Sequence, residues 1–80
     1  MSRARAVVEA IARALADKPD AVGVTEREAR GQTWLELTMA PGDMGRVIGR
    51  QGRTAQAVRA LANLAAEMDG QKVSVDFRDA

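Results

Sequence analysis

The sequence predicts a small α+β fold with the element order αββααβ, in which the helices cover one face of a three-stranded mixed sheet. Three observations predict this fold. Apolar residues recur at helical spacing between residues 4 and 15. In three short segments further along the chain, apolar residues alternate with polar ones. Two helical segments separated by glycines lie between the second and the third alternating segment. With 80 residues, we expect one domain that spans residues 1–80.

The first helix is expected from about Arg3 to Asp17. Its apolar positions are Ala4, Val7, Val8, Ile11, Ala12 and Leu15. Ser2 can cap this helix, and Pro19 stops it because the residue before a proline is pushed out of the α region. Glu9 and Arg13 interrupt the apolar stretch, so we expect neither a secretory signal nor a membrane span.

Two strands are expected next. Val22 and Val24 alternate with Gly23 and Thr25, and Leu35, Leu37 and Met39 alternate with Trp34, Glu36 and Thr38. A polar loop from Glu26 to Gln32, with Gly31 at the reversal, is expected to join the strands in an antiparallel pair. Pro41 and Gly42 end the second strand.

Two helices and a strand complete the pattern. Met44, Val47 and Ile48 share one face of a short helix for which Asp43 is the expected cap. Helical spacing resumes at Gly52 and ends before Gly70. The apolar stripe of this second helix is Ala55, Val58, Leu61, Ala62, Ala65 and Met68. Val73, Val75 and Phe77 then alternate as the last strand, which a crossover connection makes parallel to its neighbour.

Composition excludes several classes of function. There is no Cys and no His, so disulfides, thiolate zinc sites, a cysteine nucleophile and a Ser/His/Asp triad are all excluded. We therefore expect a non-enzymatic protein of the reducing cytoplasm, with no cofactor, no metal site and no small-molecule substrate. The 46% apolar and 29% charged residues are typical of a folded globular domain.

The charge is unevenly distributed. The net charge of +1 by itself predicts no polyanionic partner. From Met44 to Ala66, however, there are four arginines and no acidic residue, whereas the rest has eight basic against eleven acidic residues, or −3. A positive segment on a mildly acidic body attracts anions to one place. A solvated helix surface is the alternative explanation.

The turn from Gly49 to Gly52 has the spacing G-x-x-G between two helices. Glycine takes positive φ and lets a ligand approach the main chain, and a helix N-terminus suits a phosphate oxygen. Arg46, Arg50 and Arg53 add positive charge around the turn, and Gln51 adds a neutral donor and acceptor. An anionic backbone is the favoured ligand, and Met44, Val47 and Ile48 could offer bases an apolar wall. The glycine spacing alone is more often that of a plain tight turn.

Residues 40–54, APGDMGRVIGRQGRT, together with the order αββααβ, resemble a type II KH domain. In length and arrangement the whole chain is similar to the small single-domain bacterial KH proteins called KhpA. The resemblance implies that the turn clamps the backbone of about four nucleotides of single-stranded RNA. The RNA-binding residues that we expect are Arg46, Ile48, Gly49, Arg50, Gln51, Gly52 and Arg53. Many relatives have Lys where Arg50 stands, and Thr54 occupies a position where an aliphatic residue is expected.

The resemblance also implies partners and a cellular setting. KhpA-like proteins are cytoplasmic RNA binders that form homodimers or pair with a larger KH-containing protein, and they are linked to RNA chaperoning and cell shape. The alternative is a protein-interaction module that keeps the KH frame and acts through a partner. Trp34, predicted on the outer face of the sheet, is then a candidate interface residue. Phe77 is expected in the core, and Arg59 and Arg30 are expected to be ordinary surface charges.

Overall fold

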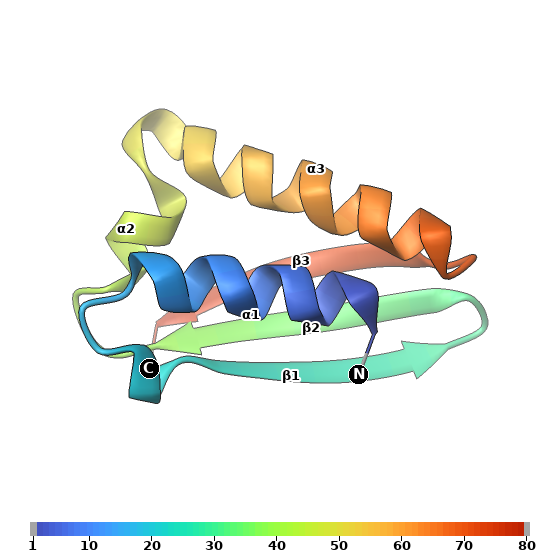
Figure 1. Ribbon diagram of the computed structural model, residues 1–80, viewed down its shortest axis with the longest axis horizontal. Helices are drawn as coiled ribbons and strands as arrows, with labels where there is room; N and C mark the ends of the chain where they lie inside the picture. Colours follow the sequence, from blue (N-terminus) through green and yellow to red (C-terminus); the bar gives the residue numbers. More distant parts are fainter. Residues whose placement is uncertain (1, 80) are drawn as a thin grey trace.

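The computed structural model describes residues 2–79 and has two layers, a three-stranded sheet and a layer of helices (Figure 1). Two short 3-10 helices, η1 and η2, join the predicted elements. In chain order these elements are α1 (Arg3–Leu15), η1 (Pro19–Ala21), β1 (Gly23–Ala29), β2 (Gln32–Met39), α2 (Met44–Ile48), η2 (Arg50–Gly52), α3 (Arg53–Met68) and β3 (Lys72–Asp79). The predicted α+β class and the order αββααβ are confirmed.

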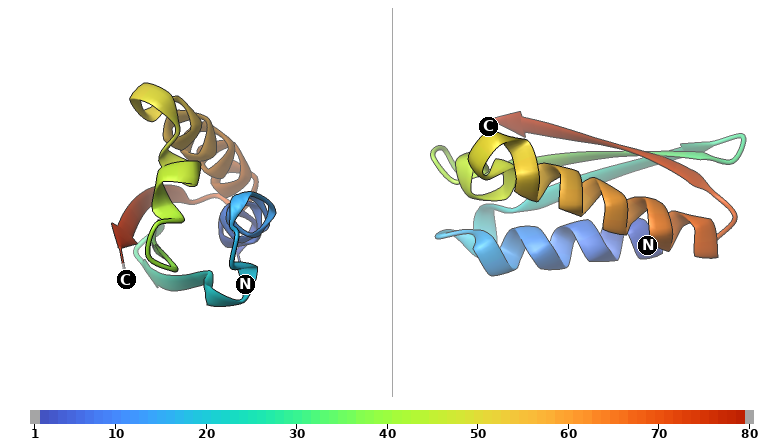
Figure 2. Two further views of the ribbon diagram at one scale, coloured as in Figure 1. Left: turned by 90° about the vertical axis from the view of Figure 1, so that its left-hand side faces the viewer. Right: turned by 90° about the horizontal axis from the view of Figure 1, so that it is seen from above.

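The sheet has the strand order β1-β2-β3. Strand β1 pairs with β2 in the antiparallel direction, from Gly23 opposite Thr38 to Ala29 opposite Gln32. Strand β3 runs parallel to β2, as predicted for the crossover through α2 and α3. Helices α1 and α3 lie side by side over one face, and no helix of residues 2–79 covers the other face (Figures 1 and 2).

The connection between β1 and β2 is shorter than predicted. The expected loop from Glu26 to Gln32 is wrong, because β1 continues to Ala29 and β2 begins at Gln32. Arg30 and Gly31 alone make the reversal, with φ of 52° and 76°. Positive φ at both central residues is the geometry of a two-residue hairpin turn, whose twist matches that of the flanking strands. The polar residues of this segment therefore belong to the strand ladder.

The ends of α1 follow local signals. The Ser2 hydroxyl accepts a hydrogen bond from the Arg5 backbone N–H at 3.1 Å, so the predicted cap is confirmed. The helix ends at Leu15, where Ala16 takes an extended conformation, and Pro19 opens η1. None of the helices within residues 2–79 has the length and apolar character needed to cross a membrane.

The core lies between the sheet and the two long helices. Its largest fully buried apolar side chains are Val8, Leu35, Leu37, Met39, Val47 and Val58. Helix α3 contributes mainly alanines to this core, namely Ala55, Ala62, Ala65 and Ala66. Small side chains at a helix interface allow close approach, so α3 can pack against both α1 and the sheet.

The apolar stripe of α3 is only partly buried. Leu61 and Met68 were predicted in the core, but they are 49% and 66% exposed, and Leu64 is 60% exposed. The prediction is wrong for Leu61 and Met68 because alanine and valine positions of the same helix occupy the contact with α1 and the sheet. Phe77 is half-buried and packs against the core as expected.

Candidate nucleic-acid interface

The glycine-bracketed turn is a bend between two helices. The Gly49 N–H closes α2 by donating to the Gly45 carbonyl at 2.9 Å, after which Gly49 takes φ 73° and ψ 178°. Gln51 and Gly52 also have positive φ, 55° and 72°, before α3 begins at Arg53. The turn projects at the end of the helical layer, on the upper left in Figure 1. Arg50 and Gln51 are exposed at its tip.

The two glycines are required for different reasons. A β-carbon on Gly49 would overlap the Thr54 hydroxyl, and the φ and ψ of Gly49 belong to a region that only glycine adopts readily. A β-carbon on Gly52 would meet open space, so this position requires only its left-handed conformation. Thr54, which departs from the aliphatic residue expected there, therefore packs its hydroxyl directly against Gly49.

Positive charge at the turn has few internal partners. Arg53 donates to the Gln51 side-chain oxygen at 3.3 Å. Within residues 2–79, no carboxylate lies within ion-pair distance of Arg50 or Arg53, and the first turn of α3 holds no acidic residue. The positive end of the 16-residue α3 helix dipole points at the same place. The turn therefore carries exposed side chains and two guanidinium groups that no carboxylate of residues 2–79 compensates.

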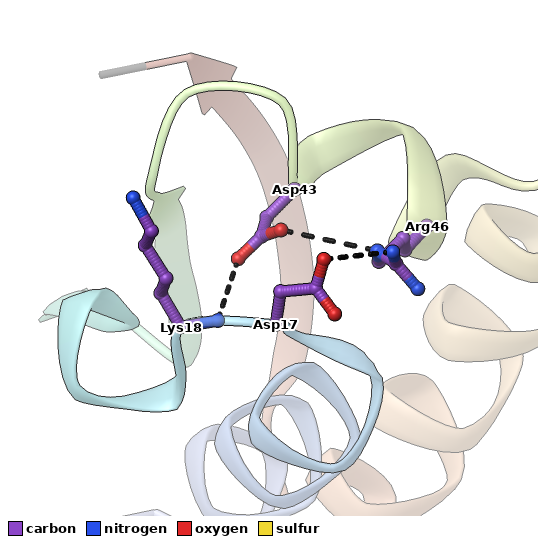
Figure 3. Close-up of polar contacts among 4 residues, drawn as sticks. All are labelled: Asp17, Lys18, Asp43 and Arg46. Carbon is purple, nitrogen blue, oxygen red and sulfur yellow. Dashed lines mark hydrogen bonds and ion pairs between the residues drawn. The ribbon is translucent and has the colours of Figure 1, made fainter.

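Arg46 differs from the other two arginines. Its Nη2 lies 2.8 Å from Asp17 Oδ2, and its Nε lies 3.9 Å from Asp43 Oδ1 (Figure 3). The positive charge of Arg46 is thus compensated by two carboxylates, whereas no carboxylate of residues 2–79 compensates the charge of Arg50 or Arg53.

The expected apolar wall is also smaller than predicted. Met44 and Val47 are buried in the core, so they do not line a surface for bases. Ile48 alone among the three is half-buried. Of the three predicted wall residues, only Ile48 can offer apolar contact beside the turn.

Asp43 does not cap α2 in the predicted way. Its side chain makes no capping hydrogen bond within the described residues. Instead, Asp43 Oδ2 accepts from the Lys18 backbone N–H at 3.0 Å, and the residue is only 5% exposed. Its partner is 25 positions away in the chain, so a local sequence signal could not have revealed this contact.

The outer face of the sheet is a second, different surface. Trp34 lies there as predicted, 38% exposed, with the Arg27 guanidinium 4.8 Å from its ring centroid. Arg78 lies 2.9 Å from Asp76 and 3.3 Å from Glu36. These contacts raise the pKa of Arg78, and the hydrogen bond that Arg78 donates to Asp76 raises it most. These side chains line a depression of about 430 Å³ on this face. Charges of both signs compensate one another on this face, so it is a poor binding surface for a polyanion.

Comparison with known proteins places this geometry in a family. The profile of the KhpA/KhpB KH domain matches residues 5–77, which include both helices around the turn. The chain belongs to the KhpA/KhpB KH-domain family. The fold of this KH domain is therefore the one that the sequence resemblance implied.

Relatives of this KH domain match over nearly their whole length. The RNA-binding protein KhpA of Caldanaerobacter subterraneus is 49% identical over 71 residues, which cover 89% of this chain and 95% of the relative. The RNA-binding protein KhpA of Halalkalibacterium halodurans is 44% identical over 75 residues, which cover 94% and 99%. These names describe RNA binding and no enzymatic reaction, in agreement with the predicted non-enzymatic class.

Solved structures share the fold. Era of Aquifex aeolicus bound to GDP and AlF4⁻ superposes with a TM-score of 0.67 at 17% identity, over 95% of this chain. A structure of Era with MgGDPNP and nucleotides 1506–1542 of 16S ribosomal RNA gives a TM-score of 0.65, also at 17% identity. This KH domain spans 29% of the longer Era chain, so the likeness concerns the fold of one part of that protein.

Proposed function

We propose that this KH domain binds single-stranded RNA without catalysing a reaction and holds the RNA backbone at Gly49–Gly52. The observation that carries the proposal is the exposed bend at the start of α3, where Arg50 and Arg53 face no carboxylate among the described residues. The relatives named as RNA-binding proteins support the same conclusion.

The contact is mainly electrostatic. Gly49 and Gly52 let the sugar-phosphate chain approach the main chain, and the N-terminus of α3 adds partial positive charge. Arg50 can bind a phosphate through two parallel hydrogen bonds, and Arg53 adds a further charge beside it. Ile48 is the apolar contact for a base at the edge of the turn. Arg46 contributes less, because two carboxylates already share its charge.

Contact with the RNA backbone allows binding of many different RNA sequences, and an RNA chaperone requires this property. The affinity of a single module is expected to fall with salt, with a slope of log K against log salt of about −0.7 for each phosphate contacted. A dimer would present two clamps and bind a long RNA more tightly than one clamp does.

The clamp is tested by changing Arg50 and Gln51 together to Asp. We expect binding of a short single-stranded RNA, titrated at two salt concentrations, to be lost while circular dichroism and the melting temperature stay near those of the wild type. Arg50→Asp alone and Arg30→Asp form a matched pair, because both reverse one exposed charge and Arg30 lies in the hairpin turn at the opposite end of the molecule (Figure 1). Retained binding in the folded double variant would refute the clamp.

We also propose that the partner of α3 is a second copy of this chain. The exposed apolar side chains Leu61, Leu64 and Met68 follow one another at three and four residues, the spacing of a helix seam. The exposed Ala57 continues the row by one turn and leaves room for a facing helix. Three large apolar side chains at 49%, 60% and 66% exposure on one helix face favour burial against a partner.

Self-association is tested by Leu64→Lys, with Leu15→Lys as the control. Leu15 is an exposed leucine on α1, 37% exposed against 60% for Leu64, and lies away from this row. Sedimentation equilibrium should show a dimer for the wild type and for Leu15→Lys, and a monomer for Leu64→Lys. A wild type that stays monomeric at all concentrations, but assembles with a larger KH-containing protein through α3, would assign this face to that protein.

A further inference from the structure

Helix α2 holds the first half of the turn, although it is too short to be stable alone. It spans five residues, and its last turn leads directly into Gly49. A helix of this length gains little from its own hydrogen bonds and depends on tertiary contacts for its orientation. Whatever fixes the orientation of α2 therefore fixes the direction in which the turn leaves it.

The connection between α1 and η1 supplies such contacts through two neighbouring residues, Asp17 and Lys18. The Lys18 backbone N–H donates to Asp43 at 3.0 Å, and the Asp17 carboxylate accepts from Arg46 at 2.8 Å (Figure 3). Asp43 and Arg46 lie one turn apart, at the start of α2 and within it. Two attachment points restrict rotation of a short helix more than one point does.

Asp43 connects these contacts. Its side chain is 7% exposed, and its two oxygens face different partners, Oδ2 the Lys18 N–H and Oδ1 the Arg46 Nε at 3.9 Å. A buried carboxylate is costly unless it is hydrogen-bonded or paired, so its retention here depends on both partners. In contrast, Asp17 is 67% exposed, and its pair with Arg46 can be removed without unfolding the protein.

We propose that Asp43, Arg46 and Asp17 form a brace that positions the RNA-binding turn. Asp43 and Asp17 are positioning residues that act through α2 and do not contact RNA. The inference rests on the proposed function of the turn. In this arrangement Arg46, which was expected to contact RNA, holds α2 against the connection that follows α1.

The sign of the effect on affinity tests the brace. Removal of an acidic charge ordinarily favours binding of a polyanion. If Asp17 positions the turn, Asp17→Asn should instead weaken binding of a short single-stranded RNA, by about twofold to fourfold. Asp17→Glu, which keeps the carboxylate, should restore most of the affinity. Asp43→Asn should weaken binding further, by about fivefold or more, because it disturbs both attachment points.

Asp20→Asn is the matched control. Asp20 lies in the same connection, in η1, and makes no ion pair within the described residues. Its substitution removes the same charge and should leave affinity unchanged or slightly raised. In the free protein, backbone amide chemical shifts of residues Gly49–Gly52 should move in Asp17→Asn and stay in place in Asp20→Asn.

The outcomes separate this inference from the proposed function. Asp17→Asn binding that equals or exceeds that of the wild type would overturn the brace, and tighter binding would show that Asp17 withholds Arg46 from RNA. Failure of Asp17→Glu to restore affinity would also overturn it. If the Arg50 and Gln51 double variant binds like the wild type, the clamp itself is refuted. If Asp43→Asn does not fold, the Asp17 variants still decide the question.

Discussion

The two ends of α3 face solvent with opposite chemistry. At its N-terminus, Arg53 and the adjacent turn present positive charge without an acidic residue in the first helical turn. Further along, Leu61, Leu64 and Met68 present exposed apolar surface. Because alanines occupy much of the buried side of α3, the helix contributes few large apolar residues to the core of the domain. One helix therefore presents positive charge at one end and apolar surface along the rest.

The largest effect is expected at the turn, where Gly49→Ala should abolish RNA binding and lower the free energy of unfolding by about 2–4 kcal/mol. The added methyl group both overlaps the Thr54 hydroxyl and strains the backbone. Gly52→Ala, with open space around it, should cost only about 1 kcal/mol. Urea denaturation of the two variants measures the difference, and equal losses would contradict the separate roles assigned to the two glycines.

The independence of the two ends is tested with RNA length. Leu64→Lys should bind an RNA too short to reach two clamps as tightly as the wild type does. For an RNA that spans both clamps of a dimer, the same variant should lose about tenfold or more in affinity through the loss of avidity. Fluorescence anisotropy with both RNAs, at equal protomer concentration, provides the measurement. Equal losses for both lengths would mean that the apolar face and the clamp are not separable.

A smaller effect, on stability, is expected at Arg59, which lies between the two ends of α3. Its guanidinium lies 4.7 Å from the Phe77 ring centroid, and its Nη2 donates to the Val75 carbonyl at 3.4 Å. Arg59→Ala should lower the free energy of unfolding by about 0.5–1 kcal/mol through loss of this packing. Arg59→Lys, which keeps the charge and loses the planar group, should recover only part of it. Thermal denaturation monitored by circular dichroism is sufficient.

The smallest effect is expected from pH. The chain contains no His, the side chain whose ordinary pKa lies in the neutral range. RNA affinity at constant ionic strength should therefore be flat between about pH 6 and 8. A titration step in that interval would mean that a group outside the turn controls binding.

Local patterns predicted those parts of the fold that depend on neighbouring residues. The cap at Ser2 and the reversal at Gly31 follow from short-range geometry, and both are confirmed. The predicted length of the loop between β1 and β2 was wrong because strand pairing, and not local polarity, determines how far β1 continues. For Leu61 and Met68, helical periodicity gave the correct helix but not which of its sides faces the sheet.

The candidate site shows the same limit. The positive φ at Gly49 and Gly52 follows from their residue type and spacing, and the structure has both. In contrast, the partners of Asp43 and Arg46 lie 25 and 29 positions away. Only the packing of α1 against α2 brings them together. Sequence reasoning therefore found the charged residues but could not tell which of them already have partners.

A β-carbon at position 49 and the Thr54 hydroxyl would occupy the same small space. The residue at one of these positions therefore limits what fits at the other. A smaller residue at 54 would make room for a methyl group at 49, yet the positive φ at 49 would still disfavour it. A bulkier side chain at 54 would have to turn away from the turn or push it outward. Glycine is therefore expected to be fixed at 49 among related sequences, with only the residue at 54 free to change.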